Sequence, residues 1–119
     1  TIMIVDTDKD IINIGKNFLS KLGYNPIVAK NSEEAVQIFS EQKEDIRLVI
    51  IDLETPGING KELFLQLKQI NENAKILVST KQSTNINIEG FLNQGCHGLI
   101  QKPFSLKDLS FELRAILDK

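Results

Sequence analysis

Four residues with chemically useful side chains stand where short apolar runs of the chain end. Phosphoryl transfer requires a nucleophilic oxygen, with positive charge and hydrogen-bond donors around the phosphoryl oxygens. Each residue alone is an ordinary turn or surface residue, but a set of two carboxylates, one hydroxyl and one ammonium meets this requirement. The four are Asp6, Asp52, Thr80 and Lys102, near the ends of the runs 2–5, 48–51, 76–78 and 99–100.

Each of the four has a distinct candidate role in this chemistry. Asp52 is the candidate nucleophile, and Asp6 is the candidate ligand of a Mg²⁺ ion, which would relieve the repulsion between the two carboxylates. Lys102 can pair with a carboxylate or a phosphate as a point charge. Thr80 can donate its hydroxyl to a phosphoryl oxygen.

The elements that position these residues alternate along the chain. Continuous apolar runs, typical of strands buried on both faces, occupy 2–5, 27–29, 48–51, 76–78 and 99–100. Segments with helical spacing of apolar residues separate and follow them, the weakest being 86–94. Five such alternations predict an α/β fold, a doubly wound parallel sheet with helices on both faces. Ligands of such sheets bind beyond the carboxyl ends of the strands.

Several residues mark where helices begin and end. Asn31 precedes two glutamates, and Ser105–Asp108 has the pattern of a capping box. Gly23 and Gly95 stand where helices are expected to stop.

Composition limits the possible functions. The 119 residues, 41% hydrophobic and 25% charged, suit one globular domain over 1–119. A formal charge of −2 without a basic cluster argues against direct nucleic-acid binding, and no apolar run reaches the roughly 18 residues of a membrane span. The single Cys96 fits a reducing compartment, so we expect the cytoplasm. Because Thr1 leads straight into a strand pattern, we expect the domain to be part of a longer chain.

Four segments carry a family resemblance: Ile4-Val5-Asp6, Leu48–Asp52 with Pro56-Gly57 and Gly60, Val78-Ser79-Thr80 and Gly98–Phe104. With these segments, the whole chain resembles the response-regulator receivers of two-component signalling. The resemblance implies a flavodoxin-like receiver fold, a five-stranded parallel sheet in the order 2-1-3-4-5 with five helices. More narrowly, Gly95-Cys96, Ile100–Phe104 and the segment from Leu109 to Asp118 resemble C-terminal receivers of hybrid sensor histidine kinases.

The resemblance also implies a site. Asp52 becomes the phosphoacceptor, Thr80 and Lys102 contact the phosphoryl group, and Asp6 with the main-chain carbonyl of Glu54 helps to hold Mg²⁺. The bond between Lys102 and Pro103 is cis in the family, which would aim the lysine inward.

A histidine kinase or its phosphohistidine domain is the implied partner, and the kinase core of the same chain is one candidate. The implied enzymatic activity is at most Mg²⁺-dependent self-phosphorylation from phosphohistidine, followed by slow autodephosphorylation.

The chain departs from the family at three positions. Thr7 stands where a second acidic residue is usual, which should weaken the metal site, although the Glu54 side chain could reach back to the metal. Lys81 replaces a small residue at the entrance of the site; it is either an exposed lysine or a cation that pairs with Asp52 or Glu54. Leu99 replaces an aromatic residue whose ring rotates on activation, so activation must take another form, a shift between existing states.

Two other functions remain open. Thr7 and Lys81 also suit a degenerate receiver that acts as a phosphorylation-independent protein-interaction module. A third reading takes Asp6-Thr7-Asp8 as the nucleophile motif of haloacid-dehalogenase-like phosphatases, but that family needs further acidic residues and usually a cap domain. The lone His97 is expected to be a loop residue without a zinc site, and Cys96 a small packed residue.

Overall fold

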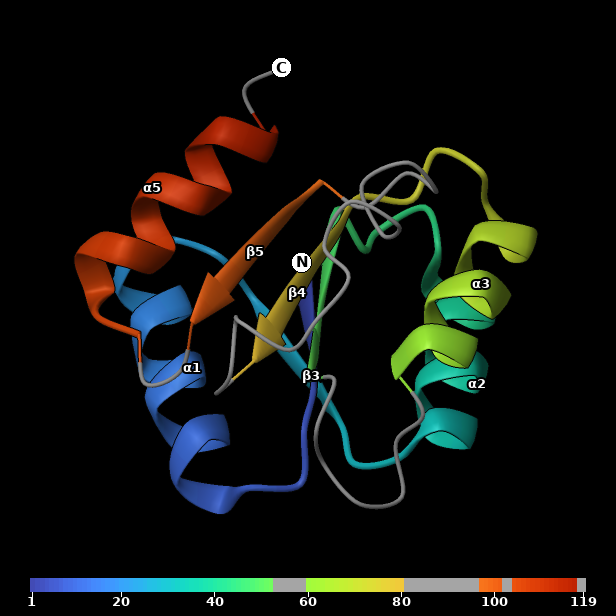
Figure 1. Cartoon of the computed structure of the whole chain (residues 1–119), viewed down its shortest axis with the longest axis horizontal. Coiled ribbons are helices and arrows are strands. Elements are labelled where there is room, and N and C mark those ends of the chain that lie inside the picture. The colour runs from blue at the N-terminus through green and yellow to red at the C-terminus, as the bar shows by residue number, and fades with distance from the viewer. Residues whose placement is uncertain (53–59, 81–96, 102–103, 118–119) are drawn as a thin grey trace.

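The computed structural model describes residues 1–52, 60–80, 97–101 and 104–117. Strands and helices alternate along residues 1–80, as the sequence pattern predicts, and a further strand and helix follow from residue 98 (Figure 1). The helix expected over 86–94 and the stop expected at Gly95 lie outside the described residues. The elements are β1 (Ile2–Val5), α1 (Lys9–Lys21), β2 (Pro26–Ala29), α2 (Ser32–Gln42), β3 (Leu48–Asp52), α3 (Gly60–Ile70), β4 (Ile76–Thr80), β5 (Gly98–Gln101) and α5 (Leu106–Leu117).

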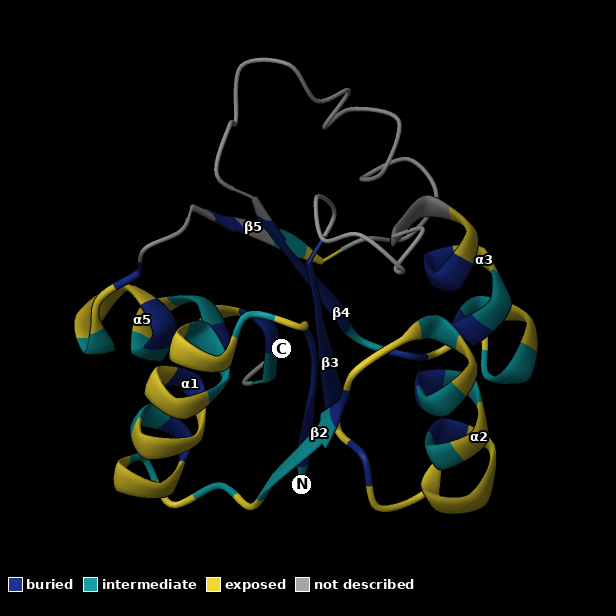
Figure 2. Cartoon of the chain, turned by 90° about the horizontal axis from the view of Figure 1, so that it is seen from below, coloured by how far each residue is buried: buried dark blue, intermediate teal, exposed yellow. Residues whose placement is uncertain are grey.

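The strands form one parallel sheet in the order β2-β1-β3-β4-β5, which is the order the resemblance implies. Crossover helices connect parallel strands and must cover the faces of the sheet. Figure 2 shows α1 and α5 on one face and α2 and α3 on the other, with buried strands between the two layers. The sheet therefore has two separate cores.

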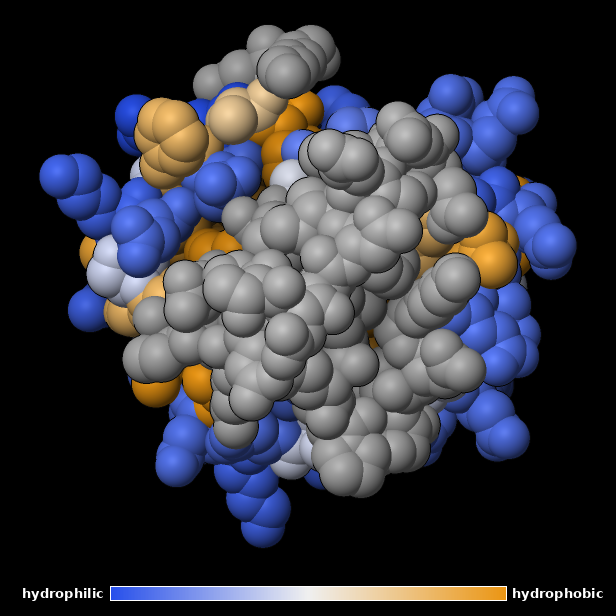
Figure 3. All heavy atoms as spheres, in the orientation of Figure 1, coloured by the Kyte–Doolittle hydropathy of each residue, from blue (hydrophilic) through white to orange (hydrophobic). Residues whose placement is uncertain are grey.

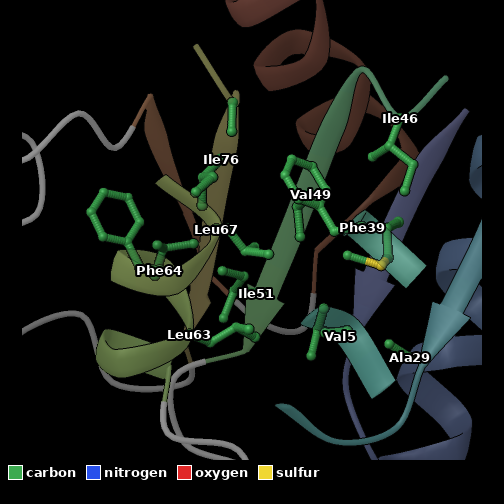
Figure 4. Close-up of a cluster of buried hydrophobic side chains, with 14 residues drawn as sticks. Val5, Ala29, Phe39, Ile46, Val49, Ile51, Leu63, Phe64, Leu67 and Ile76 are labelled. Carbon is green, nitrogen blue, oxygen red and sulfur yellow. The ribbon is translucent and has the colours of Figure 1, made fainter. Parts of the chain in front are cut away.

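Alternation along each strand divides the apolar side chains between the two cores. On the side of α2 and α3, Val5 and Ile51 pack with helix residues such as Phe39 and Leu67 (Figure 4). On the side of α1 and α5, the alternate strand residues pack with Leu19, Leu109 and Leu113, among others. Two apolar faces per strand explain why the strand sequences are continuous apolar runs.

The predicted helix ends that lie within the described residues are confirmed. The Asn31 side chain accepts a hydrogen bond from the Glu34 amide at 2.8 Å, which caps α2. In the capping box of α5, the Asp108 amide donates to Ser105 Oγ at 3.0 Å and the Ser105 amide donates to Asp108 Oδ2 at 3.4 Å. Gly23 follows α1 with a φ of 89°, a left-handed conformation that costs glycine little.

The strands differ in detail from the prediction. Asp52 and Thr80 are the last residues of β3 and β4, rather than residues that follow these strands. β2 is half-buried over most of its length, because it lies at an edge of the sheet and has only β1 as a neighbour. No helix of the described residues is long and apolar enough to cross a membrane.

Candidate functional site

Asp52 ends the central strand of the sheet. β3 lies between β1 and β4, and all five of its residues are buried. The Asp52 side chain itself is only 2% exposed, at the carboxyl end of the strand. A carboxylate buried at the end of an apolar strand is expensive unless charges or donors compensate it, so the position is a candidate for chemistry.

Asp6 places a second carboxylate on the neighbouring strand end. It follows β1 directly and is also 2% exposed, and its amide donates to the carbonyl of Ala29 at 3.2 Å. Because Val5 pairs with Ile51 in the register of β1 and β3, the residues that follow them, Asp6 and Asp52, are neighbours across the sheet. The fold thus brings two buried carboxylates together at its carboxyl edge.

The residues after Asp6 form the turn into α1. Thr7 is exposed, and the amide of Asp8 donates to Asp6 Oδ1 at 3.0 Å. The Asp8 carboxylate caps α1 by accepting hydrogen bonds from the amides of Asp10 at 2.9 Å and Ile11 at 3.4 Å. Asp8 therefore stabilises the helix start and does not take the place of the acidic residue that Thr7 replaces.

The remaining predicted site residues are only partly placed. The backbone of Thr80 pairs with Gln101, and Leu99 pairs with Val78 one step earlier on β4 and β5. Figure 1 shows the arrowheads of these two strands pointing the same way, so Thr80 and Gln101 end at the same edge of the sheet. The other predicted residues, Lys102, Glu54, Lys81 and Pro103, lie outside the described residues.

Ser79 is a buried residue of the site that the sequence pattern did not indicate. Its side chain is 2% exposed, and its backbone pairs with Asp52 across β3 and β4. Its Oγ donates to the carbonyl of Ile51 at 3.4 Å. A serine one residue before Thr80 at a strand end was the available signal, but only the strand register reveals that it lies beside Asp52.

His97 is an exposed residue just before β5, as predicted, yet its ring has a structural role. Its Nδ1 accepts a hydrogen bond from the Ile76 amide at 3.3 Å, and its own amide donates to the Ile76 carbonyl at 2.9 Å. These contacts join the starts of β4 and β5, at the end of the sheet opposite to Asp6 and Asp52. His97 thus takes no part in the candidate site.

The described part of the site offers oxygen ligands. Asp6 and Asp52 supply carboxylates, the ligand type that Mg²⁺ prefers alongside water. No group of three or more His, Cys, Asp and Glu side chains gathers among the described residues. This donor set suits a hard cation with several water ligands and lacks the nitrogen and sulfur ligands typical of zinc.

The residues from 2 to 114 match the family model of the response regulator receiver domain. The chain belongs to the response regulator receiver family. It is thus a receiver domain of two-component signal transduction, a role that implies a histidine kinase as partner. This membership leaves the dehalogenase-like phosphatase reading of Asp6-Thr7-Asp8 without support.

Curated relatives agree with this family. The probable transcriptional regulator ycf29 of Porphyra purpurea is 35% identical over 111 residues, which cover 91% of this chain and 52% of the relative. The transcriptional regulatory protein CpxR of Escherichia coli K12 is 29% identical, with 98% of this chain and 48% of the relative covered. The receiver chain spans about half the length of these relatives.

Solved structures show the same fold. A CheY-like receiver from Methanospirillum hungatei JF-1 superposes with a TM-score of 0.85 at 27% identity, covering 98% of this chain and 92% of the other. CheY in the CheX-CheY complex from Borrelia burgdorferi gives a TM-score of 0.92 at 20% identity, covering 99% and 89%. The second likeness concerns the fold alone.

Proposed function

We propose that Asp52 of this receiver accepts a phosphoryl group from the phosphohistidine of a histidine kinase. The observation that carries the proposal is the pair of carboxylates, Asp6 and Asp52, each 2% exposed at the ends of adjacent parallel strands. A sheet with two apolar cores gains no stability from burying two like charges side by side. The presence of two carboxylates here is understandable if their charges are used.

In the proposed reaction an Asp52 carboxylate oxygen attacks the phosphorus of the phosphohistidine. The P–O bond forms as the P–N bond breaks, and the leaving histidine nitrogen keeps the electron pair and takes up a proton. Attack of water on the aspartyl phosphate later breaks the P–O bond and releases inorganic phosphate. The second step would restore Asp52.

A bound Mg²⁺ ion would neutralise the carboxylates and the phosphoryl oxygens during this chemistry. Asp6, Asp52 and the main-chain carbonyl of Glu54 are the proposed ligands, and Thr7 contributes no charge to them. Asp6 is already oriented by the Asp8 amide, which holds its Oδ1 at 3.0 Å. We expect this arrangement to bind Mg²⁺ weakly, because a carboxylate is absent at position 7.

Thr80 and Lys102 are the proposed contacts of the phosphoryl oxygens. Support comes from the register that ends β4 and β5 at Thr80 and Gln101, since Lys102 is the next residue along the chain. The hydroxyl would donate a hydrogen bond and the ammonium would pair with the added negative charge. Three further residues are proposed to modulate the site. Lys81 would lie at its entrance, and Leu99 would take the place of the aromatic residue that rotates on activation. Pro103 would orient Lys102.

The wider setting is part of the proposal. We infer one receiver domain over 1–119 of a longer cytoplasmic protein. The narrower likeness to C-terminal receivers of hybrid kinases would make the kinase core of the same chain the phosphoryl donor, whereas the relatives described above are named as transcriptional regulators. The proposed chemistry of Asp52 is the same in both settings.

A small-molecule phosphoryl donor with Mg²⁺ tests the proposal. Intact-mass spectrometry should detect one added phosphate on the wild-type chain and none on Asp52→Asn. Asp45→Asn, which changes an exposed aspartate after α2, is the matched control and should be phosphorylated normally. Incorporation that persists in Asp52→Asn would place the acceptor elsewhere.

A second candidate function is a receiver that binds partners without phosphorylation. It is favoured by the turn after β1, where Thr7 is exposed and Asp8 caps α1. The same assay separates the two functions, because wild-type protein that takes up no phosphate at saturating Mg²⁺ supports the interaction module.

A further inference from the structure

α5 presents an apolar side chain between two cations on its outer face. Phe111 is 70% exposed, the most exposed large hydrophobic side chain of the described residues. Lys107 and Arg114 stand four residues before and three residues after it, so the three share one face of the helix. Ser110 and Ala115 complete the same face of the helix. We call this surface the α5 ridge.

A groove of opposite charge lies between α2 and α3. Its volume is about 520 Å³, and Val36 and Leu63 provide apolar lining. Glu33 from α2 and Glu62 from α3 are exposed carboxylates of the same groove, and Gln37 and Gln66 add amide groups. We call this surface the α2–α3 groove. No cationic side chain is among the described residues that line it.

The α5 ridge and the α2–α3 groove lie on opposite sides of the sheet. Figure 2 shows α5 in one helix layer and α2 and α3 in the other. In Figure 3 both flanks of the molecule are mainly hydrophilic, with separate hydrophobic patches on the side of α5 and on the side of α3. One copy of the chain therefore cannot cover its own groove with its own ridge.

We propose that the α5 ridge of one copy docks in the α2–α3 groove of a second copy. Phe111 would enter the groove against Val36 and Leu63, while Lys107 and Arg114 would meet Glu33 and Glu62. Two cations face two carboxylates, and the groove is larger than an aromatic ring. Charge complementarity of this kind sets orientation and excludes the reverse pairing of like with like.

This contact joins different surfaces of the two copies. A heterologous contact leaves one free ridge and one free groove on every pair, so it can propagate into short chains. Both surfaces are small compared with a stable interface, so the association is weak and depends on concentration. The charge pairs lie at the surface, and raised salt weakens them.

Sedimentation velocity over a range of protein concentrations tests the contact. Wild-type protein should show a sedimentation coefficient that rises with concentration and falls back when salt is added. Phe111→Ser on the ridge and Glu33→Lys with Glu62→Lys in the groove should each weaken the association by at least about tenfold. Both changes are at exposed positions, so the variants should fold.

Mixing the two variants gives the decisive result. The variant with Glu33→Lys and Glu62→Lys has an intact ridge, which cannot dock in the altered groove of another copy of the same variant. That ridge can dock in the intact groove of the Phe111→Ser variant. A mixture should therefore form one-to-one dimers and no longer species. Leu65→Ser, which removes another exposed hydrophobic side chain from α3, is the control and should associate like wild type.

Three results would overturn the proposal. Wild-type protein that stays monomeric at all concentrations has no such contact. A variant with Glu33→Lys and Glu62→Lys that still associates like wild type, although Phe111→Ser abolishes association, indicates a symmetric contact of α5 with α5. An effect of Leu65→Ser as large as that of Phe111→Ser indicates non-specific hydrophobic association.

Discussion

The two ends of the parallel sheet differ in how far their polar side chains are buried. At the carboxyl end, Asp6, Asp52 and Ser79 are each 2% exposed, and they are the buried polar side chains of the described residues. At the amino end, His97 and Arg47 are exposed, and hydrogen bonds between backbone groups join the strand starts. The carboxyl end buries charge, whereas the amino end buries almost none.

This difference in burial suggests a functional role for the carboxyl end of the sheet and a structural role for the amino end. Burial of a charged group costs free energy, and the proposed chemistry of Asp52 gives a reason for charge to be buried at only this end of the sheet. Contacts such as those of His97 with Ile76 satisfy backbone groups and hold the strands in register. We therefore expect changes at the carboxyl end to alter phosphorylation and changes at the amino end to alter the free energy of unfolding.

Asp6→Asn gives the largest expected effect after Asp52→Asn. It removes a proposed Mg²⁺ ligand charge, so both Mg²⁺ affinity and the rate of phosphorylation should fall by about 10- to 100-fold. The free energy of unfolding should not fall, because the change relieves repulsion between two carboxylates. Isothermal titration calorimetry and urea unfolding measure the two quantities. If Asp6→Asn lost much stability and was phosphorylated normally, the carboxyl end would have a structural role and the proposed role in phosphorylation would be wrong.

Thr7→Asp should increase the Mg²⁺ affinity of the site at the carboxyl end of the sheet. A second carboxylate next to Asp6 should raise Mg²⁺ affinity by about tenfold and speed phosphorylation from a small-molecule donor. Thr7→Asn adds the same shape without the charge and is the control. Equal Mg²⁺ affinity in the two variants would mean that position 7 does not reach the metal site.

His97→Ala tests the amino end. The Ile76 amide loses the ring acceptor at 3.3 Å, so the free energy of unfolding should fall by about 1 kcal/mol while phosphorylation stays at the wild-type rate. His97→Asn, whose side-chain oxygen can accept the same hydrogen bond, should recover most of the loss. Urea unfolding of the three proteins measures the effect. A change in the phosphorylation rate would contradict the prediction, because it would show that the amino end influences the site at the carboxyl end.

Glu112→Gln should have the smallest effect. Burial, and then the negative charge of Asp108, raise the pKa of Glu112, whose carboxylate lies close to Gly98 at the amino end of β5. Because the folded state binds this proton more tightly than the unfolded state, the wild-type chain loses stability as pH rises through the raised pKa. The glutamine variant should be more stable at neutral pH by less than about 0.5 kcal/mol.

Measurements at acidic pH check the sign of the effect of Glu112→Gln. Below the ordinary glutamate pKa of 4.5 the carboxyl is protonated in both states, and the difference between Glu112→Gln and wild type should vanish. Thermal unfolding at neutral and acidic pH measures it. A stability difference that grows toward acidic pH would contradict the assignment.

Local sequence patterns predicted much of this fold. The apolar run of β1 and the caps at Asn31 and Ser105 depend on neighbouring residues, and each appears in the structure where the sequence places it. The ends of β3 and β4 were placed one or two residues too early, because Asp52 and Thr80 are polar and an apolar pattern stops before them. Pairing with the next strand, rather than hydrophobicity, extends these strands.

Other features depend on residues far apart in the chain. Ser79 matters because the register of β3 and β4 sets it beside Asp52, and the His97 ring matters because β5 brings it to the Ile76 amide. None of these outcomes is encoded in a local spacing.

The sequence by itself determined the alternation of strands and helices and the residue types that end the strands, because hydrophobic periodicity and capping act over a few residues. Only the tertiary structure decided that Asp6 and Asp52 are both buried, and that the basic α5 ridge and the acidic α2–α3 groove lie on opposite sides of the sheet. Burial and placement arise from strand register and helix packing, which join segments distant in sequence.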